Sequence, residues 1–291
     1  MCQNRIKKVI LLFEADKDKI ICSFCKSSDV IKHGKDCGHQ RYRCKKCGKT
    51  FSETKFRVCE GSSKSIDVWK QYFDSMMGGD SLRESAEKCG ISLFTSFFWR
   101  HKLLAAFGKV LENNVLKGEL SFDTVFMKAS YKGNRKNTPK PKLYIGISSA
   151  VAPNGISRSR IASVNSMTSA AADYALSNSI EGNSDGFTDK KVFSQLASHK
   201  KIKLAPFKSK EYRLKSVVSY NSRMNGFFER FNGVSSKYLE NYLYWLDIPL
   251  DNKNLFDEVM AAVSNIKNDD IYNLPPIPHI PSEVRAKNKT N

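Results

Sequence analysis

Eight cysteines lie at or before position 89, and four of them are spaced as metal ligands. Cys22 and Cys25 form one Cys-X-X-Cys pair, and Cys44 and Cys47 form a second pair. Two intervening residues let both thiolates of a pair reach one tetrahedral ion, and thiolates favour Zn²⁺. The spacing therefore predicts a structural zinc ribbon. A thioredoxin-type redox pair is the alternative, and the presence of two matched pairs argues against it.

The position of the cysteines also indicates a compartment. The chain contains no cysteine after Cys89, whereas a secreted protein held by disulfides would spread them along its length. Three further residues, Cys37, His33 and His39, fit the ligand spacing less well. We therefore expect local metal binding in a reducing, cytoplasmic compartment.

Two aspartates stand out by their position in the second half of the chain. Asp123 lies within an otherwise apolar stretch that reads as a strand, and Asp185 lies near the end of another expected strand. A carboxylate in such a place is costly unless it pairs or binds a cation. Two of them could hold Mg²⁺ through oxygen ligands. The alternatives are a structural ion pair at Asp123 and a capping role for Asp185.

The net charge of +19 indicates a polyanionic partner. Residues 240–291 hold 5 basic and 8 acidic side chains, so residues 1–239 carry 43 − 21 = +22. Such a field favours nucleic acid, because phosphate neutralisation releases counterions. The alternative is a soluble basic protein with no such partner.

Ten basic side chains are the candidate DNA contacts. Two loops, Lys128–Lys142 and Lys200–Lys215, are rich in lysine and arginine and could follow phosphates, or could be solvated loops. The candidates are Arg41, Arg43, Lys45 and Lys46 in the ribbon, Arg100, His101 and Lys102 in a helix, and Lys132, Arg135 and Lys136 in the first loop.

The helix just mentioned belongs to a helical segment that follows the ribbon. Apolar residues at helical spacing predict a helix over 65–77 that Gly78-Gly79 ends. Ser81, with Glu84 three residues later, predicts a capping box for a short helix over 82–88. Gly90 then fits the turn before a longer helix over 92–107. The pattern predicts a DNA-binding helix-turn-helix, with a plain helical bundle as the alternative.

The rest of the chain has the alternating order of an α/β domain. Strands are expected over 120–127, 143–151 and 156–164, and Asn154-Gly155 predicts a hairpin between the last two. Helices are expected over 166–176 and 190–198, and a long helical region over 217–246 is interrupted near Gly233. Four prolines after residue 268 predict an extended tail. The longest apolar run, Val9–Phe13, is far shorter than the roughly 20 residues of a membrane-spanning helix.

Several of these stretches resemble the transposases of bacterial insertion sequences. The stretches are Gln40–Phe51 around the second cysteine pair, Asp123 with Ser130–Asn134, Ser184–Gly186, and Arg230–Leu239 with Asn241–Leu243. In this order they are similar to the group that joins a zinc ribbon to a DDE-type, RNase H-like catalytic domain. The resemblance spans roughly residues 20–247.

The resemblance implies a multidomain protein. Its parts are a zinc ribbon (18–57), a helix-turn-helix (63–108), an α/β RNase H-like domain (117–247), and a C-terminal helix with an extended tail (248–291). It implies that the protein binds the terminal inverted repeats of an element and target DNA, and that it does so as a homo-oligomer. It also implies a location in the bacterial cytoplasm, in association with the nucleoid. It also implies Mg²⁺-dependent strand cleavage and transfer, with Asp123 and Asp185 as metal ligands on neighbouring strands.

The chain departs from the family pattern at the third catalytic residue. Where the family has an Asn, then a His, then a Lys, this chain has Val218, Asn221 and Asn225. Valine offers no oxygen to a metal, so Asn221, one helical turn later on the same face, is the expected replacement. Because one metal ligand is missing or replaced, we expect strand-transfer activity to be weak or absent.

Two other functions compete with an active transposase. One is a decayed or domesticated transposase that keeps the zinc ribbon and helix-turn-helix and acts as a DNA-binding protein. The other is a zinc-ribbon transcription regulator, which the acid-bearing α/β half disfavours.

Overall fold

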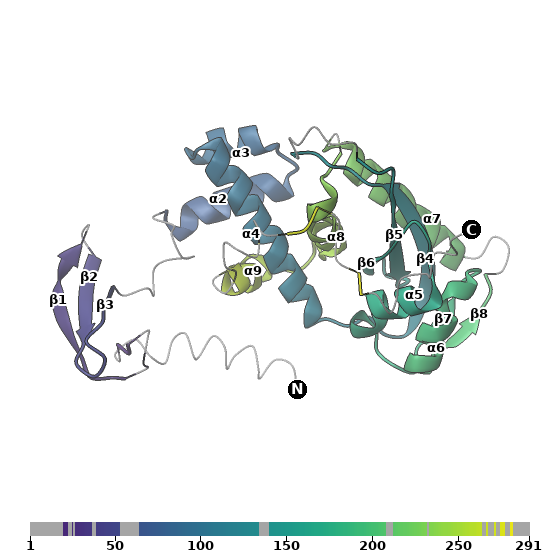
Figure 1. The fold of residues 1–291 in the computed structure, drawn as a ribbon, viewed down its shortest axis with the longest axis horizontal. Helices are drawn as coiled ribbons and strands as arrows, with labels where there is room; N and C mark the ends of the chain where they lie inside the picture. Colours follow the sequence, from purple (N-terminus) through teal and green to yellow (C-terminus); the bar gives the residue numbers. More distant parts are fainter. Residues whose placement is uncertain are drawn as a thin grey trace. The chain divides into compact units, whose positions relative to one another are not determined.

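A computed structural model describes most of the chain (Figure 1). The described residues are 20–22, 25, 27–36, 39–52, 64–133, 140–207, 212–231, 233–263, 266, 271, 274–276 and 280–281. The chain divides into two compact units, residues 1–66 and 67–291. Among the described residues, no helix combines the length and the apolar character that a membrane crossing requires.

The first unit contains a small antiparallel sheet with the order β1-β2-β3. Its strands are β1 (Val30–Asp36), β2 (His39–Cys44) and β3 (Thr50–Ser52). The buried apolar side chains that the structure describes in this unit are Cys22, Tyr42 and Cys44. Such a small core cannot offset the conformational entropy of folding, so this unit needs another source of stability.

Three helices begin the second unit: α2 (Ile66–Met77), α3 (Leu82–Cys89) and α4 (Leu93–Glu112). The predicted capping box is present, because the Glu84 amide donates to Ser81 Oγ and the Ser81 amide donates to the Glu84 carboxylate. Gly90 adopts the left-handed conformation (φ 58°) that ends α3, a conformation that costs glycine little. The expected order of a short helix, a tight turn and a long helix is confirmed.

A five-stranded sheet with the order β6-β5-β4-β7-β8 forms the centre of the second unit. Its strands are β4 (Glu119–Lys128), β5 (Tyr144–Val151), β6 (Ser157–Val164), β7 (Asp185–Phe187) and β8 (Lys203–Ala205). The hairpins β4–β5 and β5–β6 are antiparallel, whereas β7 is parallel to both β4 and β8. The sheet is therefore mixed, and β4 in its middle joins the antiparallel and parallel halves.

One face of this sheet carries the main apolar core beneath α5 (Ser169–Leu176) and α6 (Ser194–Lys200). Leu120 and Phe122 of β4 point into this core together with Leu176 and Phe193. A Cβ added to Gly186 would meet Ile202 Cγ2 and Leu204 Cδ2 at 2.7 Å, so β7 needs glycine there. Because strand side chains alternate, Ser121 and Asp123 point to the opposite face.

The opposite face is covered by α7 (Tyr212–Glu229) and α8 (Leu239–Asp247). The Asp247 carboxylate accepts hydrogen bonds from Ser157 Oγ (2.7 Å) and Tyr220 Oη (2.9 Å) and from the Ser159 amide. Arg160 Nη1 lies 3.7 Å from the same carboxylate. These contacts join β6, α7 and α8 in the interior. A further helix, α9 (Leu255–Val263), packs against α4.

Candidate functional site

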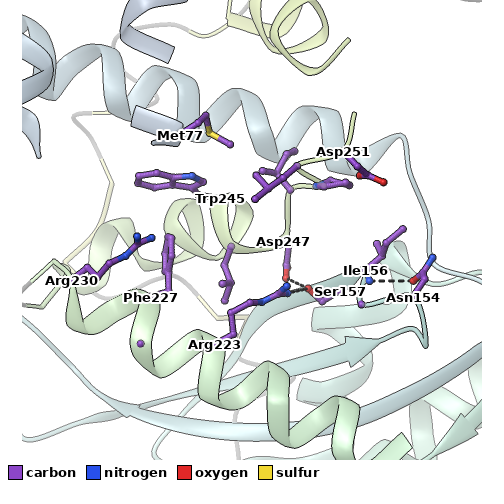
Figure 2. A pocket seen from close by; sticks show the side chains of 16 residues that line it. Met77, Asn154, Ile156, Ser157, Arg223, Phe227, Arg230, Trp245, Asp247 and Asp251 are labelled. Carbon is purple, nitrogen blue, oxygen red and sulfur yellow. Dashed lines mark hydrogen bonds between the residues drawn. The ribbon is translucent and has the colours of Figure 1, made fainter. Parts of the chain in front are cut away.

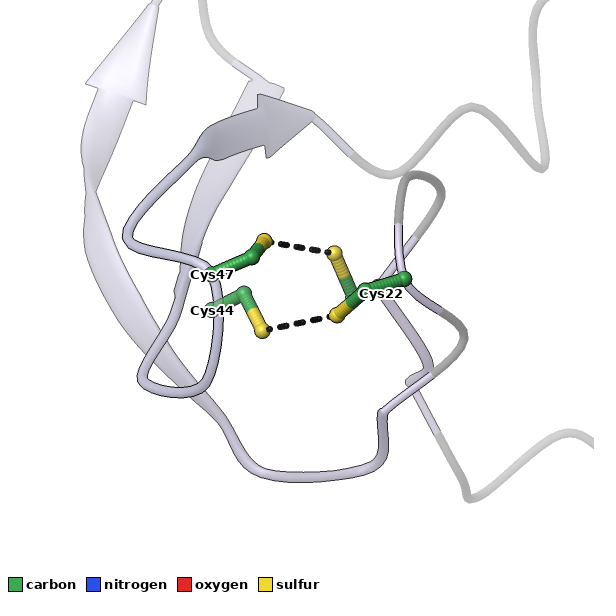
Figure 3. A group of neighbouring side chains, drawn as sticks. Cys22, Cys44 and Cys47 are labelled. Atoms are coloured by element: carbon green, nitrogen blue, oxygen red, sulfur yellow. Dashed lines mark hydrogen bonds between the residues drawn. The ribbon is translucent and has the colours of Figure 1, made fainter.

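The four predicted zinc ligands lie together in the first unit (Figure 3). Cys22 Sγ is 3.6 Å from Cys47 Sγ, and Cys25 Sγ is 3.5 Å from Cys44 Sγ. All four sulfur atoms lie within 4.8 Å of one another. This separation fits four thiolates around one tetrahedral ion at about 2.3 Å each. The donor set is therefore suited to one structural Zn²⁺.

A row of polar side chains crosses the five-stranded sheet on the face beneath α7. The strand register places Asp123 of β4 beside Ser149 of β5, and Ser149 beside Ser159 of β6. Ser149 and Ser159 are buried and their hydroxyls are 2.9 Å apart. Tyr220 of α7 bonds to Ser159, and Asn221 of α7 donates from Nδ2 to Asp123 Oδ2 at 2.8 Å. The row thus holds α7 against the sheet.

Asp123 is fixed by its neighbours. Its Oδ1 accepts the Thr124 amide at 2.8 Å, and its Oδ2 accepts from Asn221. The Asn221 Oδ1 atom is buried and has no hydrogen-bond partner among the described residues. A buried amide oxygen without a partner beside a carboxylate is suited to a hard cation such as Mg²⁺.

The structure does not bring Asp185 to Asp123, which corrects the sequence-based pairing. Asp185 begins β7 rather than ending it, and it pairs with Glu119. Glu119 precedes Asp123 by four residues, or about 13 Å along a strand. The sequence analysis expected this short strand to end near Asp185. In the structure the strand is Asp185–Phe187, so Asp185 is its first residue.

Asp189 is a second carboxylate close to the parallel pair β4–β7. The pairing of these strands ends at Ser121 and Phe187, and Asp189 follows two residues later, at a bend outside β7. The Thr188 amide bonds to the Ala205 carbonyl at 3.0 Å, which extends the alignment of this segment with β8. Asp189 is exposed, and its Oδ1 accepts the Phe207 amide at 3.1 Å. Sequence analysis missed this residue, although Asp185 and Asp189 have the i, i+4 spacing of one strand face.

The expected DNA-contact group in helix α4 is buried. Arg100 is 2%, His101 2% and Lys102 0% exposed, so these side chains cannot reach a DNA groove. Arg100 Nη2 donates to the Asp80 carbonyl at 2.8 Å, and its guanidinium lies 5.7 Å from the Trp245 ring. The prediction was wrong because α8 and α9 cover this part of α4, a contact between distant segments.

His101 is part of an aromatic cluster. Its ring centroid lies 3.9 Å from that of Tyr238 and 4.4 Å from that of Phe97. Burial, aided by the charges of Arg100 and Lys237, lowers the pKa of His101 to about 3. The imidazole is therefore neutral in the folded protein at ordinary pH.

The remaining basic candidates are distributed over the surface of both units. Arg43, Lys45 and Lys46 are exposed on the ribbon, and Arg41 is half-buried with Nη2 3.4 Å from Thr50 Oγ1. Lys132 is exposed in the turn after β4. Arg135 and Lys136 lie outside the described residues, as do parts of both basic loops.

One known family matches part of the first unit. The family of the InsA N-terminal domain, a zinc ribbon, matches residues 19–48. This range contains all four clustered cysteines.

A curated relative links the chain to mobile elements. An uncharacterised protein in the transposable element ISH50 of Halobacterium salinarum is 25% identical over 124 residues. The match covers 42% of this chain, and the chain spans only 42% of the length of that relative. With the InsA match, it confirms the resemblance to insertion-sequence transposases that carry a zinc ribbon.

The similarity of this chain to solved structures is weak. A chain of the simian T-cell lymphotropic virus intasome complex with a PP2A regulatory subunit is 11% identical, with a TM-score of 0.28 over 76% of this chain and 80% of that one. The Mos1 mariner paired-end complex with Mn gives 10% identity and a TM-score of 0.21, over 77% of this chain and 85% of that one. Overlaps this low carry no argument about fold or function.

The ribbon should contain one zinc per chain and should depend on it. Because its described core is so small, chelation should unfold residues 20–55 while the second unit stays folded. Metal analysis and amide hydrogen exchange of the two units measure this. Cys44→Ser with Cys47→Ser should lose the metal, whereas Cys89→Ser, a buried thiol of the second unit, should keep it. Zinc retained in the double variant would contradict the assignment.

The buried neutral His101 should make the second unit sensitive to acid. Its folded pKa lies below the unfolded value of about 6.5, so stability is lost as pH falls from 6.5, by up to about 1.4 kcal/mol per pH unit. His101→Phe should reduce this pH dependence, whereas His199→Gln, which removes an exposed imidazole, should not.

Urea unfolding followed by tryptophan fluorescence measures the effect, because all three tryptophans lie in the second unit. An unchanged slope between pH 6.5 and 4.5 in His101→Phe would show that another group causes the acid sensitivity.

Proposed function

We propose that this protein is a DNA transposase of the insertion-sequence type, which binds element ends and cleaves and joins DNA strands with Mg²⁺. One observation carries the proposal: the partnerless oxygen of Asn221 belongs to a side chain that bonds to the Asp123 carboxylate on the face of the sheet beneath α7. Oxygen ligands gathered in this way are typical of metal-dependent phosphoryl transfer.

The proposed catalytic domain is RNase H-like. Its support is the strand order β6-β5-β4-β7-β8, with three antiparallel strands followed by two parallel ones. The first strand of the sheet in sequence, β4, lies beside the fourth, β7. The proposed domains are the zinc ribbon (18–57), the helix-turn-helix (63–108), the RNase H-like domain (117–247) and the C-terminal helix with its tail (248–291).

Asp123, Asp189 and Asn221 would hold the catalytic metal. When bound, Mg²⁺ would act as a Lewis acid on phosphate oxygens and stabilise their charge. The chain orients the ligands in advance: the Thr124 amide fixes Asp123, and the Phe207 amide fixes Asp189. Asp185 has no such role in this proposal, because it pairs at the level of Glu119.

DNA binding in the proposal combines several surfaces. The ribbon offers the exposed side chains of Arg43, Lys45 and Lys46, and the turn after β4 offers Lys132. The helix pair α3–α4 supports a helix-turn-helix, although its contacts must come from the exposed start of α4 and not from Arg100–Lys102. Assembly as a homo-oligomer on DNA remains a prediction.

A second candidate function is a transposase without chemistry that acts as a DNA-binding protein. Val218 favours it, because the resembled family pattern has an asparagine there. Val218 is 55% exposed, so its side chain contributes little to the core and asparagine would fit without repacking. This observation makes the two functions separable by one substitution.

A strand-transfer assay with the DNA that flanks the gene tests the proposal. The unaltered protein should bind these ends specifically and transfer them weakly. Val218→Asn with Asn225→Lys should raise the yield, because it restores an oxygen ligand and a positive charge on α7.

Asp123→Asn and Asp189→Asn should abolish transfer in this background, whereas the matched variant Asp185→Asn should retain it. Specific binding with no transfer in any background would favour the DNA-binding function. Absence of end-specific binding at low salt would overturn both.

A further inference from the structure

A cavity of about 670 Å³ lies beside α7 (Figure 2). It lies between α7, the turn of the β5–β6 hairpin, the segment that follows α8, and Met77 at the end of α2. Its volume is within the range of about 300–1,000 Å³ that small-molecule sites occupy. No step of the proposed chemistry uses this cavity.

Two arginines of α7 face the cavity. Arg223 and Arg230 are seven residues apart, so they lie on one face of the helix, and both are exposed. Arg223 Nη2 donates to Ser157 Oγ at 3.2 Å, and the Arg230 guanidinium lies 5.7 Å from the Phe227 ring centroid. Neither takes part in the ion pairs found among the described residues.

The acids beside the cavity do not neutralise these arginines. Asp247 lines it but is 3% exposed, and its carboxylate is occupied by Ser157, Ser159 and Tyr220. Asp251 is exposed on the segment after α8. Two guanidinium groups thus remain available to an anion, and arginine recognises phosphate well.

Apolar side chains form another part of the wall. Phe227 and Trp245 lie edge to face, with centroids 5.4 Å apart, and Ile156 and Leu250 also border the space. Gly226 lies between the two arginines, and a Cβ added there would meet nothing within 4 Å. A flat apolar group can therefore enter beside the arginines.

We propose that the cavity binds one nucleotide of a single DNA strand. Arg223 and Arg230 pair with its phosphates, and its base packs on the apolar wall. This assignment rests on the proposed function, and it names the part of the DNA that the cavity recognises.

Binding of the zinc-loaded full chain to two DNAs tests it. One is a blunt duplex of the element end, and the other is the same duplex with a three-nucleotide single-stranded extension. Fluorescence anisotropy should show about tenfold tighter binding of the extended DNA, the effect expected from packing one base.

Gly226→Leu is the sharpest variant, because it places an apolar side chain in the cavity between the two arginines, changes no charge and replaces glycine with a good helix former. It should remove the preference for the extension and leave blunt-duplex binding unchanged, whereas Gly226→Ala should keep the preference. Arg230→Gln should also weaken the preference and lower the salt slope by about one unit. Lys109→Gln, which removes one exposed charge from α4 outside the cavity, is the matched control.

Equal affinity for both DNAs, or an unchanged preference in Gly226→Leu, would overturn the assignment. Micromolar binding of free deoxynucleoside monophosphate that Gly226→Leu abolishes, without any extension preference, would mark a site for free nucleotides and would also overturn it. Failure of the protein to bind either DNA at low salt would instead contradict the proposed function.

Discussion

Strand register across the five-stranded sheet is the constraint on which the candidate site depends. Asp123 lies beside Ser149 and Ser149 beside Ser159, while β7 pairs in parallel with β4 as far as Phe187, two residues before Asp189. Side chains of a strand alternate between faces, so a shift of one residue in β7 would turn Phe187 to the other side. Gly186 prevents such a shift, since a side chain at its position would collide with Ile202 and Leu204.

The polar row also determines where α7 lies. Tyr220 bonds to Ser159 and Asn221 bonds to Asp123, so two consecutive residues of α7 attach the helix at two places on the sheet. Asp247, at the end of α8, completes the attachment through Tyr220 and Ser157. Burial raises the pKa of Asp247, so the arrangement carries an electrostatic cost that its hydrogen bonds and Arg160 offset. The same attachment directs Arg223 toward the cavity.

The zinc ribbon has a different source of stability, because its described core is minimal and its four thiols are suited to a metal.

Local patterns in the sequence predicted much of this structure, and long-range contacts account for the errors. The cysteine spacing, the Ser81–Glu84 capping box and the Asn154-Gly155 turn each act within a few residues, and all are present in the structure. Helical periodicity placed Asn221 correctly on the face toward Asp123. The position of Asp185 depended on a parallel pairing that no local pattern encodes. The burial of Arg100–Lys102 depends in the same way on α8 and α9, which come from the far end of the chain.

The central claim, that Asp123, Asp189 and Asn221 share one metal site, can be tested by replacing magnesium with iron in the zinc-loaded protein. Reduced iron with peroxide produces hydroxyl radicals that cut the backbone close to the ion, and mass spectrometry locates the cuts. Cuts near residues 123, 189 and 221 are expected in the same sample, lost in Asp189→Asn and kept in Asp185→Asn. Cuts near residue 185, or a pattern that Asp189→Asn leaves unchanged, would contradict a shared metal site.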